Sequence, residues 1–581
     1  MRRIGDDEGV ALITVMGAMV VLTTFALGAL AFALQGAPMS RKAQDSVTAL
    51  AAAQAGIDDY ISRLNVNPTY YGVNSTGVDP ANLAFSSGAP VPGSASASFR
   101  YRLLTTPTET ARTGFIRLQS TGTSRGVSKT LTGKLAQPGF VNYVYYTDVE
   151  ALDPIFWRTD QVQASVNGSA GYVAGGEVHR YYASQDKVAE ICTRRYYEGR
   201  SSPAYTSSTS APYVDHNQTT GTSVNRTSGA TVRFSCSEIQ FTGNDTIQGP
   251  LHSNDALQVN GATNFTDRQT ETSWSDTATP APPADRRWWG GASSLAGYRP
   301  VYAPPLSLPS TNTQLVSHAA SSEGCTYKGE TRITFVGASM KVLSPQTTAA
   351  PSRCLNTANR DVEQIVTVPS VIYVDDSTSS CVSGAGYPMP DEDATSPTLP
   401  VPYASNPQSR RTTSYNCQYG NAFVSGTLKA QVTVATKRDI VVVGDIRYQD
   451  GTLGSDVLGL IPNGSAWVYN PVNSAGANLL SEAASVHRID AAILTVQHSF
   501  LVQNWNLGTS RSPSAADSDK LTVNGAIAQR ARGPVGTGTG TAATTGYLKN
   551  YVYDSRLRYL PPPYFLAPES APYELVQLSQ G

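Results

Sequence analysis

The first pattern along the chain is an uninterrupted run of apolar residues near the N-terminus. From Val10 to Leu34 the sequence contains no charged side chain. A helix rises about 1.5 Å per residue, so this run is long enough to cross a hydrocarbon core of about 30 Å. It exceeds the apolar region of an ordinary signal peptide, about 7 to 15 residues, although Ala31-Phe32-Ala33 imitates a cleavage site. The pattern predicts a membrane helix over residues 10–35, with a cleaved signal and an uncleaved anchor as alternatives.

A helical pattern resumes after this run. Gly36 and Pro38 are expected to interrupt or kink the helix. Beyond them, apolar residues recur in steps of four and three, with a single break at Gln54. This spacing predicts one apolar stripe on an amphipathic helix over residues 36–65. The stripe consists of Ala43, Val47, Leu50, Ile57, Ile61 and Leu64.

The next segment alternates between apolar and polar residues. Phe99, Tyr101 and Leu103 fall on one face of a strand, and further apolar positions follow between turn-forming Gly and Ser up to residue 137. Several short antiparallel strands laid on the preceding helix fit this pattern, so we expect a small antiparallel sheet within residues 66–140. A generic hairpin linker is the alternative.

The remaining segment, residues 141–581, contains an internal echo. DALQVNGA at 255–262 nearly repeats in DKLTVNGA at 519–526, and RDIVVVGDI at 438–446 has the same form. Each copy reads as a short strand ended by Asn-Gly or Gly-Asp, and stacked strands with such corners are typical of a right-handed parallel β-helix. Irregular spacing between the copies indicates long loop insertions. The chain is therefore expected to be mainly β with a long N-terminal α-helix; a β-sandwich with a coincidental repeat is the alternative for this segment.

Charge and cysteine content narrow the function. Charged residues make up 15% of the chain, the net charge is -1, and Lys and Arg form no long basic face, so nucleic acid is not an expected partner. All six cysteines follow the apolar run and none forms a C-x-x-C pair, which favours disulfides in an oxidising exterior over a zinc site. Six cysteines allow fifteen pairings, and buried free thiols remain an alternative. The neighbours-first set pairs Cys192 with Cys236, Cys325 with Cys354, and Cys381 with Cys417.

The candidate chemistry is sparse, and we expect no catalytic residue, metal ion or cofactor. The adjacent residues His252 to Asp255 are no triad, because triad members converge from separate segments; they are interpreted as a polar strand end with an Asx turn. The six histidines lack metal-binding spacing, and the acidic loops at 375–376 and 391–393 lack the spacing of a calcium site. ADRRWWGG is the best candidate contact surface for a sugar or a protein partner, with buried loop packing as the alternative. Its side chains are Arg286, Arg287, Trp288 and Trp289.

The N-terminal region resembles a known family. The leader MRRIGDDEG is followed by VALITVMGAMVVLTTFALGALA and then by SRKAQDSVTALAAAQAGIDDYISRLN. This arrangement resembles the type IV pilin class, and in particular minor-pilin-like proteins with a PilX-type N-terminal region. The resemblance implies that residues 1–9 are a leader and that a prepilin peptidase cuts between Gly9 and Val10. NDTIQGPLHSNDALQVNGATNF and GYLKNYVYDSRLRYLPPPYF also look like segments of large proteins that begin in this way.

The resemblance has two departures. Major pilins begin the mature chain with Phe and carry a Glu five residues in, whereas this sequence has Val10 and Thr14. A Thr cannot supply the charge that the family's Glu is thought to present to a neighbouring terminal ammonium, and an unpaired ammonium in lipid is costly. The departure therefore suits a tip or initiation subunit better than a bulk subunit. Thr14 and the apolar stripe would pack against other helices in the filament.

The resemblance and the residues together give one functional expectation. The protein would be a non-enzymatic pilus accessory subunit with its N-terminus in the cytoplasm before processing, as Arg2 and Arg3 favour. One helix would cross the membrane, and the bulk of the chain would lie outside it for tip, initiation or adhesion. Its expected partners are other pilin-like subunits, the assembly machinery, prepilin peptidase, the membrane, and a surface glycan or protein. A β-helical carbohydrate-active enzyme and a structural surface protein on an uncleaved anchor are the alternatives.

Overall fold

The computed structural model divides the chain into two compact units. The N-terminal unit comprises residues 1–111, 115–136 and 572–581, and the large unit comprises residues 112–114 and 137–571. The residues that the structure describes are 8–153, 165–166, 169–170, 173–174, 177–178, 223–224, 231–232, 239–255, 257, 259–260, 264–266, 269–273, 301–381, 400–401, 411–412, 417–473, 476–514, 516, 518–538, 543–569 and 571–580.

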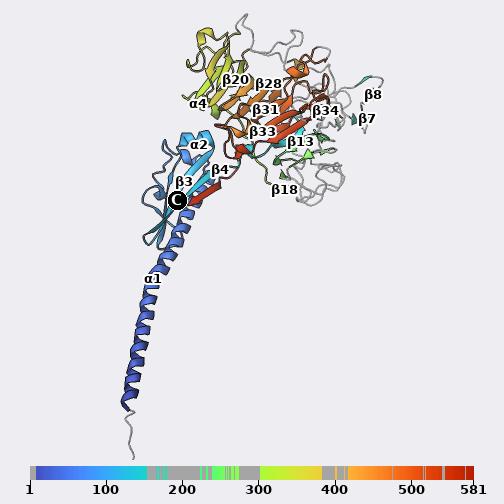
Figure 1. The fold of residues 1–581 in the computed structure, drawn as a ribbon. Helices are drawn as coiled ribbons and strands as arrows, with labels where there is room; N and C mark the ends of the chain where they lie inside the picture. Colours follow the sequence, from blue (N-terminus) through green and yellow to red (C-terminus); the bar gives the residue numbers. More distant parts are fainter. Residues whose placement is uncertain are drawn as a thin grey trace, which may run out of the picture. The chain divides into compact units, whose positions relative to one another are not determined.

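The N-terminal unit is built on one long helix, α1, which spans Glu8–Val66 and is drawn as a single coil in Figure 1. The expected interruption at Gly36 and Pro38 does not occur. A proline removes one backbone donor and crowds one turn, and the hydrogen bonds on either side can carry the helix past it. In the first half, Leu12–Leu30 is unburied, and the hydroxyls of Thr23 and Thr24 donate to main-chain carbonyls one turn back.

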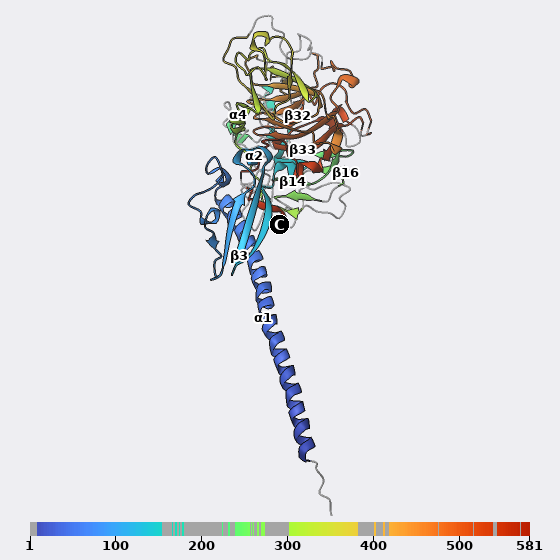
Figure 2. The ribbon, with the colours of Figure 1, turned by 60° about the vertical axis from the view of Figure 1, so that its left-hand side comes forward.

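The second half of α1 packs on a five-stranded antiparallel sheet in the order β1-β2-β3-β4-β37. Figure 2 shows β3 alongside it. The helix face that is buried differs from the predicted stripe: Ile57 and Leu64 are buried, but Ala43 and Val47 are exposed. Small residues allow the closest approach, so the buried face is centred on alanines instead of on the larger side chains. Its members are Ala49, Ala52, Ala53, Gly56, Ile57, Tyr60 and Leu64.

A glycine in the sheet explains why alanines face it. A Cβ at Gly122 of β3 would collide with the main chain of α1 at Ala49, Ala52 and Ala53. Helix and strand backbones therefore touch there, which only small residues on both sides permit. The strands are β1 Ala89–Pro90, β2 Ala97–Leu103, β3 Phe115–Ser124, β4 Val127–Ala136 and β37 Glu574–Gln580. The helix α2, Pro107–Thr113, lies between β2 and β3 in the sequence.

The sheet is completed by the end of the chain. β37 pairs antiparallel with β4, with Leu575 opposite Leu135 and Leu578 opposite Gly133. Tyr573 leads into this strand; its N–H donates to Asn65 Oδ1 at 2.6 Å and its hydroxyl donates to the Pro68 carbonyl at 3.2 Å. The sequence placed this segment in the large domain, so the expected boundary at residue 141 misses one strand of the small sheet.

The large unit contains a sheet of strands that stack mainly in parallel. The expectation of a large β-rich domain after the small sheet is confirmed. The stacked strands are β5 Tyr145–Leu152, β13 Thr246–Gln248, β14 Leu251–Ser253, β16 Asn264–Phe265, β17 Thr270–Thr272, β18 Val301–Tyr302, β19 Gly324–Lys328, β20 Thr331–Gly337, β23 Val371–Asp375, β26 Ala422–Leu428, β27 Gln431–Thr436, β28 Ile440–Tyr448, β29 Val457–Pro462, β30 Ala466–Val468, β31 Arg488–Thr495, β32 Phe500–Val502, β33 Leu521–Arg532 and β36 Lys549–Tyr553.

Shorter elements extend this sheet or pair beside it. β21 Ser339–Leu343 pairs antiparallel with β20, and β22 Gln364–Thr367 pairs antiparallel with β21. The helix α4 covers Gln314–Ala319. The remaining short strands are β6 Ser165–Val166, β7 Ser169–Ala170, β8 Val173–Ala174, β9 Glu177–Val178, β10 Ser223–Val224, β11 Thr231–Val232, β12 Phe241–Thr242, β15 Val259–Asn260, β24 Pro400–Val401, β25 Arg411–Thr412, β34 Gly536–Gly538 and β35 Ala543–Gly546.

Three ladders of aligned apolar side chains fill one buried core in the large unit. Aligned residues on neighbouring parallel strands stack because successive side chains alternate between the two faces. The first ladder runs Ile333, Val424, Val442, Val468 and Val502. The second runs Cys325, Ile372, Val434, Leu460, Ile493, Ile527, Tyr145 and Leu251. The third runs Ile446, Ile489, Val523, Tyr551, Ile247 and Phe265.

The Asn-Gly and Gly-Asp pairs were expected to end short strands, and this is wrong. β28 continues through Gly444-Asp445 and β33 continues through Asn524-Gly525. Each of these strands changes its neighbour at the dipeptide. For example, β33 lies beside β36 up to Gly525 and beside β5 from Ile527. Glycine lets the backbone turn from one ladder to the next without leaving the sheet. In the copy at 255–262, the described residues include β15, which pairs with β12 beside the large sheet.

The order of strands in the stack is not their order in the sequence. From β19 to β33 the chain passes step by step along the stack. β33 and β36 then pair with β5 and β13, which precede them by several hundred residues. We call these pairings, β33 with β5 and β36 with β13, the junction. The stack therefore consists of two chain segments that meet in its interior.

Candidate functional site

The polar residues singled out in the sequence, His252 to Asp255, lie at the end of β14 as predicted. His252 is 1% exposed and its ring stacks on Tyr146 at a centroid distance of 5.7 Å. Its Nδ1 lies 3.3 Å from Glu271 Oε2 and its Nε2 lies 3.0 Å from Asn254 Oδ1. The His252 ring is the main reason why the pKa of Glu271 lies below its ordinary value.

These residues also form hydrogen bonds to segments that are distant in the sequence. Asn254 Nδ2 donates to Tyr146 Oη and Asp148 Oδ1, both at 2.8 Å, and Asn254 Oδ1 accepts from the Leu306 N–H at 2.9 Å. Asp255 Oδ2 accepts from the main-chain N–H of Glu150 at 3.1 Å. The cluster thus holds β14 to β5 and to the segment before α4, which is a structural task.

The junction carries two buried ion pairs. Arg532 Nη1 lies 2.6 Å from Glu150 Oε2, and the two side chains are 1% and 2% exposed. Lys549 Nζ lies 2.7 Å from Asp245 Oδ2, with exposures of 9% and 1%. Burial lowers the pKa of Lys549, and the Asp245 carboxylate opposes this shift. Sequence analysis missed all four residues, because their partners lie several hundred residues away.

Hydrogen bonds complete the environment of Glu150. The hydroxyls of Thr147 and Tyr145 donate to its Oε1, and the Arg532 guanidinium lies 3.7 Å from the ring centroid of Phe241. A buried charge is tolerated when its partner and its remaining hydrogen bonds are in place. Glu150 and Asp255 are both buried, and the main-chain N–H of Glu150 donates to Asp255 Oδ2 at 3.1 Å.

A second buried carboxyl has a different environment. Glu330 lies at the corner between β19 and β20 and is 1% exposed. Its carboxylate oxygens are buried without a hydrogen bond of ordinary geometry within the described residues, and the nearby Asn421 side chain only partly favours the ionised form. Burial raises its pKa to about 8. Its main-chain N–H donates to the Cys417 carbonyl at 3.1 Å. Nothing in the sequence around Glu330 marked it.

Two of the three predicted disulfides are confirmed. Cys325 bonds to Cys354 and Cys381 bonds to Cys417, with Cα–Cα distances of 5.6 and 5.8 Å. Among the described residues there is no free cysteine. Cys192 and Cys236 lie outside the described residues. The two bonds suggest that the large unit resides in an oxidising, extracytoplasmic compartment.

The other expected sites fall partly outside the described chain. Arg286, Arg287, Trp288 and Trp289 lie there, as does the acidic loop at 391–393. Asp375 and Asp376 form ion pairs with Lys328 at 2.6 Å and with Arg438 at 2.8 Å. Across the part of the chain that is described, no three metal-binding side chains gather in one place.

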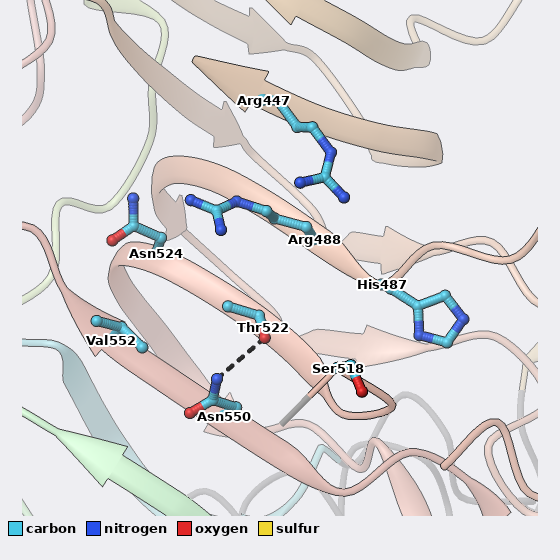
Figure 3. A pocket seen from close by; sticks show the side chains of 8 residues that line it. All are labelled: Arg447, His487, Arg488, Ser518, Thr522, Asn524, Asn550 and Val552. Carbon is cyan, nitrogen blue, oxygen red and sulfur yellow. Dashed lines mark hydrogen bonds between the residues drawn. The ribbon is translucent and has the colours of Figure 1, made fainter. Parts of the chain in front are cut away.

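The large unit has two hollows of interest. One, of about 270 Å³, is lined by residues near the Asp245–Lys549 pair, including Trp505 and Tyr547. The other, of about 450 Å³, is a groove lined mainly by polar residues on the outward side of the third ladder, shown in Figure 3. We call it the arginine groove. It is lined by Arg447, His487, Arg488, Ser518, Thr522, Asn524, Asn550 and Val552.

Comparison with known proteins gives little help. No family model matches the chain, and no curated protein matches it. Three chains of solved structures match. One is described as the crystal structure of the competence-associated pilin ComZ from Thermus thermophilus; it is 11% identical, and the match covers 92% of this chain and 98% of that chain with a TM-score of 0.23. Such a TM-score does not establish a shared fold.

Proposed function

We propose that the protein is a membrane-anchored, pilin-like accessory subunit of a type IV pilus-like filament, and that it displays its large unit outside the cell without catalysing a covalent step. The observation that carries this proposal is the division of α1. The helix is continuous over 59 residues, its first half is apolar and unburied, and its second half packs on an antiparallel sheet. A helix divided in this way has an apolar surface that needs lipid or other helices around it.

The membrane part of the proposal rests on Leu12–Leu30. This segment has a mean hydropathy of 2.1 and none of it is buried within the chain. By length and composition it can cross a membrane, and it could act as an anchor or as a signal. Large apolar side chains such as Leu22 and Phe25 are 68% and 75% exposed. In lipid, exposure of these side chains carries no free-energy penalty. In an assembled filament they would pack against the helices of neighbouring subunits.

The leader is the second element of the proposal. Gly9 and Val10 lie in the first turn of α1. Cleavage between them would start the mature chain at the beginning of the apolar segment, as expected for a subunit that enters a filament through its helix. Thr14 in place of an acidic residue favours a tip or initiation position, because the subunit offers no carboxylate to the terminal ammonium of a neighbour. The exposed Val47 remains available on α1 for such packing.

The large unit is the displayed part. We infer that it is a right-handed parallel β-helix with long insertions; the support is the set of three apolar ladders that share one core. Stacked parallel strands present long flat faces, which suit contact with an extended glycan or a protein surface. The disulfides Cys325–Cys354 and Cys381–Cys417 would protect the domain outside the cell.

N-terminal sequencing and intact mass test the proposal. The full chain is produced in cells with and without an active prepilin peptidase. We expect Val10 as the terminal residue only when the peptidase is present, and we expect Gly9→Leu to abolish the cleavage. Gly17→Leu is the matched control: Gly17 has open space around it, so this variant should be cleaved normally. A Met1 terminus in every sample would reject the pilin interpretation in favour of an uncleaved anchor.

A further inference from the structure

The arginine groove is formed by the outward side chains of strands whose inward side chains build the third ladder. Ile489 and Val523 point into the core, and their neighbours Arg488, Thr522 and Asn524 face the other way. Figure 3 shows that the lining side chains come from successive strands of the stack. Regular strand spacing therefore fixes the polar groups at repeated intervals along the groove.

The two arginines of the groove are held by carboxylates. Arg447 Nη2 lies 2.7 Å from Asp445 Oδ2, and Arg488 Nε lies 2.8 Å from Asp490 Oδ1. Asp445 is itself fixed, since its Oδ1 accepts from the main-chain N–H groups of His487 and Arg488. A guanidinium has five N–H donors, so each arginine keeps donors for a ligand while its orientation is set in advance.

Amide groups line the groove between the two arginines and β36. Asn550 is fixed on both sides: its Nδ2 donates to Thr522 Oγ1 at 3.0 Å, and its Oδ1 accepts from Gln248 Nε2 at 3.1 Å. Asn524 is only 5% exposed, and within the described residues its Nδ2 has no hydrogen-bond partner. A buried donor without a partner is unfavourable, and a turn of the Asn524 side chain toward the groove would let a ligand oxygen satisfy it.

The charge and shape of the groove restrict the ligand. Its two guanidinium groups are balanced by the carboxylates of Asp445 and Asp490, so a densely charged polyanion gains little from it. Among the described residues that line it, there is no Trp, Tyr or Phe on which a base could stack. Hydrogen-bonding donors beside paired arginines suit a ligand rich in hydroxyls that carries an isolated carboxylate. The volume of about 450 Å³ lies within the range of small-ligand sites.

We propose that the arginine groove binds an acidic oligosaccharide, with a uronate carboxylate held between Arg447 and Arg488 and sugar hydroxyls held by Asn524 and Asn550. This assigns a ligand class to the display role proposed above and does not depend on leader processing. The two proposals therefore fail separately: binding can be measured on the full chain in detergent, whichever residue is at its N-terminus.

The test is calorimetric titration of the detergent-purified full chain with a galacturonate trisaccharide and with its carboxyl-reduced counterpart. We expect the acidic sugar to bind at least tenfold more tightly than the reduced one. Arg447→Gln and Arg488→Gln should each weaken binding about 10- to 100-fold, as expected for loss of a charge-assisted hydrogen bond. Asn524→Asp should weaken binding, because it replaces the amide donor offered to a sugar hydroxyl by a negative charge in the groove.

A matched control variant separates the groove from general charge effects. Arg438→Gln also breaks an exposed Arg–Asp pair, 2.8 Å from Asp376, but lies outside the groove, so its affinity should equal that of the wild type. Equal binding of the two sugars, or unchanged affinity in both groove arginine variants, would overturn the proposal. Tighter binding of a single-stranded oligonucleotide than of the trisaccharide would also overturn it, in favour of nucleic acid.

Discussion

Both units use the end of the chain to complete a sheet, but they do so in opposite ways. In the N-terminal unit, β37 adds to an edge of the small sheet, and most of its residues are exposed. In the large unit, β33 and β36 pair with β5 and β13 inside the stack, where nearly every residue is buried. An edge strand needs only backbone pairing, whereas a junction inside a stack must match a core on both sides.

The difference between the edge strand and the junction explains why buried ion pairs are found at the junction. The apolar ladders are uniform, and stacked Val and Ile side chains alone would tolerate a strand in several registers. At the junction the ion pairs Glu150–Arg532 and Asp245–Lys549 are formed between the two segments. A displaced register would leave buried charges without partners, which is costly. We infer that the pairs select the correct meeting of the two segments.

The largest effect is expected from Arg532→Met. The change leaves Glu150 buried without its cation, and breaking a buried pair from one side costs about 3–5 kcal/mol. Urea unfolding followed by the fluorescence of the buried Trp467 should show this loss in the transition of the large unit. Arg530→Met is the matched control, since Arg530 is 35% exposed and its contact with Asp148 is longer, at 3.5 Å; it should cost less than about 1 kcal/mol.

A second variant tests whether the Glu150–Arg532 pair selects the register of the two segments or adds to the stability of the fold. Arg532→Met combined with Glu150→Met removes both charges, and such replacements are often neutral or stabilising. We expect the double variant to recover most of the lost free energy of unfolding. Equal losses in Arg532→Met and Arg530→Met would mean that the junction does not depend on this pair.

The next largest effect on stability is expected from a variant of Glu330, whose buried carboxyl group lies in the large unit away from the junction. Its pKa of about 8 lies above the ordinary value of 4.5, so the folded state keeps a proton that the unfolded state releases. The resulting stability is fully present below about pH 4.5 and is lost as the pH rises to about 8, by up to about 1.4 kcal/mol per pH unit. Glu330→Gln should remove this slope and be more stable than the wild type above pH 8.

The measurement is the free energy of unfolding at several pH values, taken as the difference between each variant and the wild type. Glu363→Gln is the control, because Glu363 is 40% exposed in a surface pair with Lys341, and its replacement should change the free energy of unfolding by less than about 1 kcal/mol. A pH-independent difference for Glu330→Gln would show that the Glu330 carboxyl ionises as it does in water. The absence of a paired cation at Glu330 within the described residues, in contrast to Glu150, would then have no consequence for stability.

The spacing of apolar and polar residues predicted those elements that depend on residues near in sequence. The long helix, the antiparallel strands on it and two disulfides could all be read from residues that are near in sequence. The buried face of α1 could not, because contact of its backbone with Gly122 selects alanines over larger residues. The strand β37 and the junction were also missed, since nothing in a short segment reveals a partner several hundred residues away.

The same limit applies to the candidate sites. Arg532 lies in the segment QRARG and looks like one of several surface cations until its partner strand is known. The arginine groove combines side chains from β28, β31, β33 and β36 with two loop residues, His487 and Ser518, and no spacing in the sequence unites them. The cluster His252 to Asp255 could be recognised in the sequence because its members are adjacent. Their adjacency indicated neither that they are buried nor which residues they bond to.

The smallest effect is expected from removing β37. A chain that ends at Tyr573 keeps the contacts of this residue with Asn65 and Pro68 and loses only the edge strand. The hydrogen bonds that are lost and the conformational freedom that is regained nearly cancel, so the cost should be about 1 kcal/mol. Hydrogen exchange should show faster exchange at the β4 amides near Leu131 and unchanged protection in β33.

A side-chain variant tells which part of β37 matters. Val576 and Leu578 are 45% and 44% exposed, so Val576→Thr with Leu578→Thr keeps the backbone pairing and removes little burial. We expect this variant to protect the β4 amides as well as the wild type does. If it behaved like the truncated chain, side-chain packing would hold β37, and the edge addition would resemble the buried junction more than the contrast between the two units allows.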